Sequence, residues 1–231
     1  MKLPLIISVP HAGMVVPQEV QDYCALTPEQ IFADSDEGAA EIYNLKSDVL
    51  IYITTDIARA IVDMNRAEQD RGRDGIIKTH TCYNAQVYHQ PMPEDVVEIL
   101  LDRYYRPYHQ RLSESAADVK FGVDCHTMSA VGPPSATDSG CERPNICLSN
   151  AHGTCPQDWF EKMVQCLEAS FDSEISVNHP FKGGYIIRSH SSELPWVQVE
   201  LSRAPFLPIA EKRECVLKAL ALFCRTVFDD Q

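Results

Sequence analysis

Seven short apolar runs, most of them rich in valine and isoleucine, set the strongest constraint on how this 231-residue chain can fold. They occupy residues 5–9, 49–55, 60–64, 121–125, 175–178, 185–189 and 196–201. Several runs lack the polar alternation of a strand with one face in water, so they predict strands that are covered on both faces. A sheet of this kind needs helices on both sides.

Amphipathic segments between and after the runs predict these helices. Residues 93–112 carry apolar side chains at every fourth position, and Pro107 predicts a bend within them. Residues 156–171 and 209–228 each place apolar side chains on one helical face. Strands that alternate with helices predict an α/β fold, with a mixed, largely parallel sheet flanked by helices on both faces. The length fits one domain over residues 1–231.

The charge and cysteine content limit the function classes. A formal net charge of −13 argues against nucleic acid or an anionic membrane as the main partner, because both bind basic surfaces. A small anionic substrate stays compatible, since a few clustered arginines can reverse the field locally. No apolar stretch is long enough to span a bilayer or to serve as a secretory signal. Nine scattered cysteines without a Cys-x-x-Cys pair predict reduced thiols and a cytoplasmic location.

Polar side chains end two of the predicted strands. His11 follows the first strand, and the strand at 121–125 runs into Asp124 and His126, which share a face because strand side chains repeat with period two. A third cluster offers the carboxylates of Asp34, Asp36 and Glu37. Two histidines and one carboxylate are a usual ligand set of a hydrolytic zinc site. The alternative is structural: strand-end histidines with ordinary hydrogen bonds, and acids placed favourably at a helix start.

Two further residues could carry catalysis near these strand ends. Cys125 cannot use His126 as its base, because neighbours on a strand point to opposite faces, so a cysteine hydrolase would need another histidine. Glu200 lies at the end of the apolar strand 196–201, on the face opposite Val197 and Val199. It could act as a general base beside a metal, or it could form a salt bridge with Arg203.

The segment 61–75 resembles a ligand-binding strand end followed by a loop. Asn65 beside Arg66 can grip a substrate carboxylate, since a guanidinium binds both carboxylate oxygens at once. The following sequence RGRDG predicts an exposed loop, and the Gly-, Pro- and Ser-rich stretch 130–140 predicts another beside His126.

Eight motifs in order make the chain similar to the N-formylglutamate amidohydrolase family, which comprises metal-dependent deformylases related in fold to zinc carboxypeptidases and aspartoacylase. The motifs are PHAG (10–13), DSD (34–36), VDMNR (62–66), YRPYH (105–109), DCHTM (124–128), RPNICLSNAHGTC (143–155), GGYIIR (183–188) and VQVELSR (197–203). The likeness covers nearly the whole chain. It implies the phosphorylase/hydrolase-like fold of the zinc carboxypeptidases.

The resemblance also implies roles for particular residues. His11, Asp36 and His126 would hold one Zn²⁺ ion, and Glu200 would be the catalytic base. Arg66 would bind the substrate or the oxyanion formed from it, as would three further residues: Asn65, Arg143 and Arg203. Zinc carboxypeptidases read His-x-x-Glu at their first two ligands, whereas the third residue after His11 is Met14, which favours the deformylase branch.

The expected activity is therefore cleavage of N-formyl-L-glutamate, or of a similar small N-acyl amino acid, to formate and the free amino acid. The alternatives are a carboxypeptidase-like or other N-acyl-amino-acid hydrolase on the same fold, and a non-catalytic protein that binds a metal or ligand. The sequence does not indicate an oligomeric state.

Overall fold

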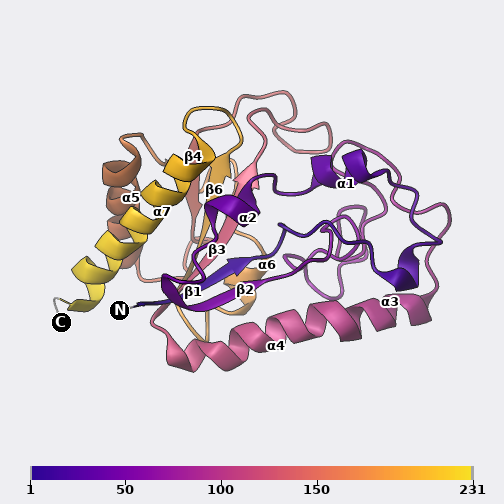
Figure 1. The fold of residues 1–231 in the computed structure, drawn as a ribbon, viewed down its shortest axis with the longest axis horizontal. Helices are drawn as coiled ribbons and strands as arrows, with labels where there is room; N and C mark the ends of the chain where they lie inside the picture. The colour runs from indigo at the N-terminus through magenta and orange to yellow at the C-terminus, as the bar shows by residue number, and fades with distance from the viewer. Residues whose placement is uncertain (1, 230–231) are drawn as a thin grey trace.

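The computed structural model describes residues 2–229, whose strands form one six-stranded sheet (Figure 1). The strands are β1 (Leu3–Val9), β2 (Val49–Thr54), β3 (Phe121–Met128), β4 (Ile146–Ser149), β5 (Ser176–Val177) and β6 (Trp196–Ser202). Their order across the sheet is β2-β1-β3-β6-β4-β5. Strands β2, β1, β3 and β6 are mutually parallel, β4 is antiparallel to β6, and β5 is parallel to β4. The predicted mixed, largely parallel sheet is confirmed.

The helices lie between and after these strands. They are α1 (Pro28–Asp34), α2 (Ala39–Ile42), α3 (Glu94–Leu100), α4 (Arg106–Ser115), α5 (Gln157–Phe171), α6 (Tyr185–Ser189) and α7 (Ile209–Cys224). Short 3₁₀ segments occur at Gln18–Val20 and Ala116–Asp118, and π-helical turns at Leu101–Tyr105 and Arg225–Asp229. The π turn at Leu101–Tyr105 joins α3 to α4 in one long helical rod (Figure 1), and Pro107 is the second residue of α4. None of the helices within residues 2–229 combines the length and apolar character needed to cross a bilayer.

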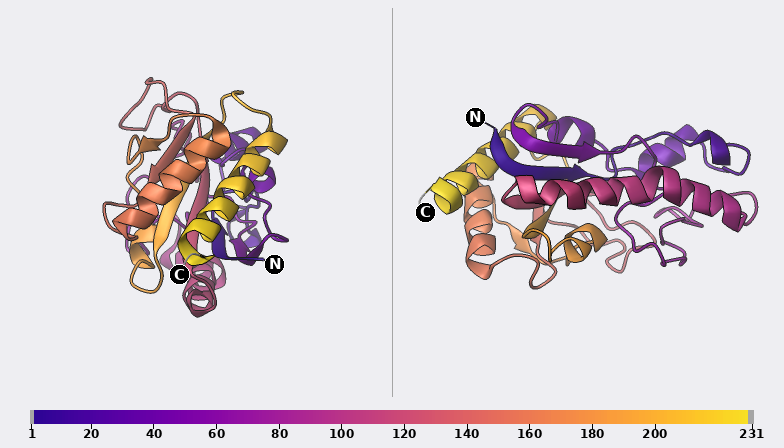
Figure 2. Two further views of the ribbon diagram at one scale, coloured as in Figure 1. Left: turned by 90° about the vertical axis from the view of Figure 1, so that its left-hand side faces the viewer. Right: turned by 90° about the horizontal axis from the view of Figure 1, so that it is seen from below.

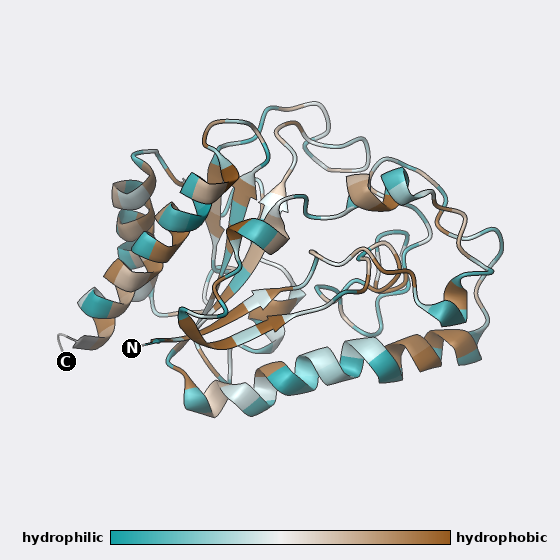
Figure 3. Ribbon diagram, in the orientation of Figure 1, coloured by the Kyte–Doolittle hydropathy of each residue, from teal (hydrophilic) through white to brown (hydrophobic). Residues whose placement is uncertain are grey.

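Helices cover both faces of the sheet, as the sequence predicts. Helices α5 and α7 pack side by side on one face, and the α3–α4 rod runs along the other (Figure 2). The strands feed both layers: Leu5 and Ile7 of β1 belong to the core under α5 and α7, while Ile6 belongs to the core under α4. Hydrophobic residues accordingly run along the strands, whereas hydrophobic and hydrophilic residues alternate around α7 (Figure 3). Period-two packing into two cores fixes which side chains each face presents.

Two of the predicted strands are wrong. Residues 60–64 form turns, in which the Asp63 N–H donates to the carbonyl oxygen of Ile76, and residues 185–189 form the helix α6. The run 60–64 is buried throughout and the run 185–189 through Ile186 and Ile187, and a short buried apolar run has the same composition in a strand, a helix or a loop. The sequence reasoning also missed β4, whose four residues ICLS are all buried.

Candidate metal centre and active site

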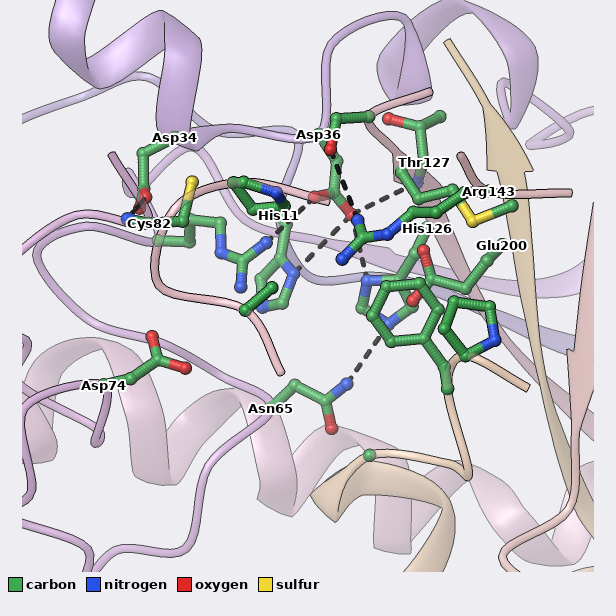
Figure 4. A pocket seen from close by; sticks show the side chains of 18 of the residues that line it. His11, Asp34, Asp36, Asn65, Asp74, Cys82, His126, Thr127, Arg143 and Glu200 are labelled. Atoms are coloured by element: carbon green, nitrogen blue, oxygen red, sulfur yellow. Dashed lines mark hydrogen bonds and ion pairs between the residues drawn. The ribbon is translucent and has the colours of Figure 1, made fainter. Parts of the chain in front are cut away.

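One pocket of about 400 Å³ opens at the carboxyl ends of the parallel strands. His11 enters it directly after β1, His126 from β3 and Glu200 from β6. Ligands in open α/β sheets commonly bind at this edge. The side chains converge from segments far apart in the sequence (Figure 4).

The pairing of β3 with β6 places the polar side chains on one face. His126 lies opposite Glu200, and Asp124 lies opposite Gln198. The intervening Cys125 faces the apolar core instead, which is the orientation that the sequence predicts. Burial, and then the charge of Asp124, raise the pKa of the Cys125 thiol well above its ordinary value. This thiol is therefore a poor nucleophile.

The carboxylate of Asp36 reaches the pocket from the end of α1. The helix begins with a capping box between Thr27 and Gln30. Two residues after its end, the N–H of Asp36 donates to the carbonyl oxygen of His11 (3.1 Å). Asp34 instead accepts from the N–H of Cys82 (2.7 Å), and Glu37 is exposed. Of the three acids left open by the spacing, the fold brings Asp36 to the two histidines.

The three side chains form a compact buried cluster. One oxygen of Asp36, Oδ2, lies 2.9 Å from Nδ1 of His126 and 3.6 Å from Nδ1 of His11. One nitrogen or oxygen ligand atom from each residue lies within 4.8 Å of the others. Nδ1 of His11 is buried without a hydrogen-bond partner among the described residues. This group of two imidazoles and one carboxylate could bind a metal ion. The unpartnered Nδ1 of His11 is available as a metal ligand.

Each imidazole is oriented from behind by a buried carboxylate. Nε2 of His11 lies 2.7 Å from Oδ1 of Asp63, and Nε2 of His126 lies 2.8 Å from Oδ2 of Asp124. Such contacts keep the proton on Nε2 and turn the other ring nitrogen toward the metal position. Asp124 is also a hydrogen-bond acceptor for Ser8 (2.8 Å) and Asn65 (3.1 Å), which explains an acid at the end of a buried strand.

The electrostatics of the cluster favour a cation. Burial by itself raises the pKa of the Asp36 carboxyl, but the rings of His11 and His126 outweigh burial and hold this pKa well below its ordinary value. Burial lowers the pKa of His126, whereas the charges of Asp124 and Glu200 reverse this and raise it well above its usual range. The surroundings thus attract positive charge at this point, as a metal site does.

Glu200 projects from β6 beside this cluster. Its Oε1 accepts a hydrogen bond from Nε2 of Gln198 (2.9 Å), and burial raises its pKa to about 7. The alternative salt bridge to Arg203 does not form among the described residues. Arg203 donates to the carbonyl oxygen of Ser35 (2.5 Å) and lies 3.9 Å from Asp36 Oδ1.

The other residues predicted to contact substrate also line this pocket, but they have protein partners. Asn65 donates to Asp124 and accepts from the N–H of Ile186 (2.8 Å). The Arg66 guanidinium donates to the carboxylate of Asp74 (2.5 Å) and to the backbone carbonyl oxygen of Asp74 (2.7 Å). The predicted loops supply part of the lining, Asp74 from one and Pro133 from the other.

Sequence reasoning gave no role to several residues of this site. Arg59 donates to Asp36 Oδ1 (3.1 Å), and the fully buried Lys78 lies 3.4 Å from Asp63. Gln198 links the N–H of Gly184 to Glu200. For Gln198 the sequence held a signal, its polar side chain within an apolar strand. Arg59 and Lys78 had none, because loops bring them together with their partners.

These features define the class of the protein as an α/β protein with a buried, metal-compatible histidine–carboxylate cluster at the carboxyl ends of parallel strands. A family model described as N-formylglutamate amidohydrolase matches residues 3–207, so the chain belongs to that family. The resemblance drawn from its motifs is confirmed, and the chain is a hydrolase of the amidohydrolase class.

Individual relatives agree with the family match. The chain is 24% identical over 230 residues to an N-formylglutamate deformylase from Pseudomonas putida, covering 91% of this chain and 84% of the relative. An N-formylglutamate amidohydrolase from Ralstonia eutropha JMP134 superposes with a TM-score of 0.76 at 19% identity, over 97% of this chain and 93% of that one. A gene product from Agrobacterium tumefaciens superposes with a TM-score of 0.74 at 16% identity, over 100% and 91%. The predicted relation to zinc carboxypeptidases stays a prediction.

Proposed function

We propose that this chain is a zinc-dependent amidohydrolase that cleaves N-formyl-L-glutamate to formate and L-glutamate. The observation that carries the proposal is the convergence of His11, Asp36 and His126 on one point of the pocket, with Glu200 on the neighbouring strand. The family match and the deformylase relative support the substrate.

The donor set supports zinc as the metal. Neutral imidazole nitrogens and one carboxylate are ligands that zinc commonly takes in hydrolases, with a position left for water. His11, Asp36 and His126 would hold the ion. A zinc ion there supplies a Lewis acid, which makes water acidic enough to lose a proton near neutral pH.

Glu200 would carry the proton transfers. Its pKa of about 7 lies near the operating pH, where a general base is most effective, and its second carboxylate oxygen is not used by Gln198. It would take a proton from the attacking water and return it to the nitrogen of the departing amine. Gln198 fixes the orientation of the carboxylate during both transfers.

The arginines of the pocket would hold the anionic substrate. Six lysine or arginine side chains line the pocket against five aspartates and glutamates, although the chain as a whole carries −13. Arg66, Asn65, Arg143 and Arg203 are the candidates for substrate carboxylates or for the oxyanion. Holding both ends of the substrate would raise the effective concentration of the scissile amide beside Glu200.

The decisive experiment replaces Glu200 by glutamine and measures turnover and metal content together. E200Q should lower kcat on N-formyl-L-glutamate by about 10²- to 10⁴-fold, the usual contribution of a general base, while elemental analysis still finds bound zinc. E168Q, which makes the same change on the exposed face of α5, should behave as wild type. Undiminished turnover in E200Q would exclude the base role.

Two measurements separate the alternatives. Activity that is lost on chelation and restored by zinc supports a metalloenzyme, whereas bound metal without chelation-sensitive turnover favours a binding protein. Turnover that falls as the acyl group grows from formyl to acetyl and larger groups supports a deformylase, and the opposite trend favours another N-acyl-amino-acid hydrolase. The cytoplasmic location and the one-domain organisation stay predictions.

A further inference from the structure

Five arginines line the pocket, and four of them are already engaged by other residues of the chain. The five are Arg59, Arg66, Arg143, Arg188 and Arg203. Arg143 donates from Nε (2.7 Å) and Nη2 (2.8 Å) to the two oxygens of Asp138, so its fork is occupied. Arg66 is held in the same way by the carboxylate and carbonyl of Asp74.

The two arginines nearest the metal cluster are engaged by that cluster. Arg59 donates to Asp36 Oδ1 (3.1 Å) and lies 3.5 Å from Asp63 Oδ2. Arg203 donates to the carbonyl oxygen of Ser35 and lies near Asp36. Their charges are therefore partly balanced by the buried Asp36 carboxylate before any substrate binds.

Arg188 differs from these four. Within the part of the chain that the structure describes, its guanidinium has neither a hydrogen bond nor an ion pair, and the residue is exposed at the last turn of α6. Lys182, which precedes α6, also lines the pocket without a partner among the described residues. Of the two, only the guanidinium can bind both oxygens of a carboxylate in a fixed fork.

The backbone that carries Arg188 is tied to the site at two points. The N–H of Ile186 donates to Oδ1 of Asn65 (2.8 Å), and the N–H of Gly184 donates to Oε1 of Gln198 (2.6 Å). The fit is close, because a Cβ on Gly184 would lie 2.2 Å from Nδ2 of Asn65. Arg188 is thus a free cation on a helix whose position is fixed relative to the candidate base.

The place of Arg188 suits the distal end of a dicarboxylic substrate. The α-carboxylate of an N-acyl amino acid is one carbon from the amide nitrogen, so its partner must lie close to the metal cluster. The side-chain carboxylate of a glutamyl group lies two carbons farther from the amide, and Arg188 lines the pocket as an exposed residue, unlike the buried residues of the metal cluster. We propose that Arg188 binds this side-chain carboxylate and selects dicarboxylic over neutral N-acyl amino acids, an inference that rests on the proposed function.

The test compares N-formyl-L-glutamate with N-formyl-L-glutamine, which has the same shape without the side-chain charge. Loss of a charge-assisted hydrogen-bond pair in R188Q should raise KM for N-formyl-L-glutamate by about 10- to 100-fold, with little change in kcat. KM for N-formyl-L-glutamine should not change. R188K should recover part of the loss, and R111Q, on the exposed face of α4, should match wild type.

Several outcomes would overturn the assignment of Arg188. One is an equal rise of KM for both substrates in R188Q, which indicates a contact with the part that they share. Another is an unchanged KM for N-formyl-L-glutamate. A third is loss of the preference in K182Q but not in R188Q.

Calorimetric binding of the amino acids separates this inference from the proposed function. If wild-type protein turns over neither substrate, the proposed function fails. Arg188 is then judged by binding of L-glutamate and L-glutamine to wild type and R188Q. Weaker L-glutamate binding in R188Q, with L-glutamine unaffected, supports the inference. Equal binding in both proteins, or no binding of L-glutamate to wild type, refutes it.

Discussion

Replacing Asp63 by asparagine should weaken zinc binding although Asp63 is not one of the candidate ligands. Oδ1 of Asp63 lies 2.7 Å from Nε2 of His11, and the residue is fully buried. Burial raises the pKa of Asp63, but His11 and Arg66 outweigh it and hold this pKa well below its ordinary value, so the acceptor is charged. An asparagine retains an acceptor oxygen and loses the charge that makes His11 a stronger donor to metal.

The size of the effect follows from the position of Asp63 behind an imidazole. Loss of such an outer carboxylate typically lowers metal affinity by about 10- to 100-fold, which corresponds to about 1.4–2.7 kcal/mol. The other oxygen of Asp63 lies 3.4 Å from Nζ of Lys78 and 3.5 Å from Nη2 of Arg59. An amide nitrogen there would meet cationic donors, so the fold should lose stability as well.

The stability loss in D63N should stay below the full cost of breaking a buried ion pair, which is about 3–5 kcal/mol. Lys78 keeps the carboxylate of Asp74 at 2.9 Å, and Arg59 keeps that of Asp36. We therefore expect a loss of about 2–3 kcal/mol in the free energy of unfolding, which is below that range.

The matched control is D74N, which removes a carboxylate from the same lysine but does not contact His11. Zinc affinity is measured by competition with a chromophoric chelator, and stability by urea unfolding of the metal-free proteins. Both variants should be less stable than wild type, and only D63N should bind zinc more weakly. Equal zinc affinity in D63N and D74N would show that Asp63 does not act through the imidazole.

Two further predictions concern the fold around the site. In G122A the new Cβ would lie 2.2 Å from Cδ2 of Trp196, so the free energy of unfolding should fall by at least about 1–3 kcal/mol in urea titrations, and an unchanged midpoint would contradict the packing. Burial, and then the charge of His190, lower the pKa of His109 to about 4. Because the folded state then binds fewer protons than the unfolded state between the ordinary histidine pKa of 6.5 and about 4, wild-type stability should decline as pH falls through this range. H109Q should lose stability less steeply over the same range, and parallel curves would exclude this contribution.

Local pattern was sufficient to predict the strands that matter most for the site. The apolar runs at 5–9, 121–125 and 196–201 are β1, β3 and β6 in the structure. Period two then gave the shared face of Asp124 and His126, because a strand leaves no other choice once its core face is known. The runs 60–64 and 185–189, which were wrongly predicted as strands, also place apolar side chains in the core under α4. Packing in that core decided their conformation.

Tertiary structure decided which acid joins the histidines and which arginine stays free. Spacing does not distinguish Asp34, Asp36 and Glu37, and only the family resemblance favoured Asp36. The end of α1 turns Asp34 toward Cys82, Asp36 toward His11 and Glu37 to solvent. Arg66, Arg143 and Arg188 likewise look alike until loops supply Asp74 and Asp138 to the first two. The sequence alone determined the strands and their polar ends, since those follow from local periodicity. Contacts between side chains distant in the chain depend on how the loops pack, and only the folded structure defines them.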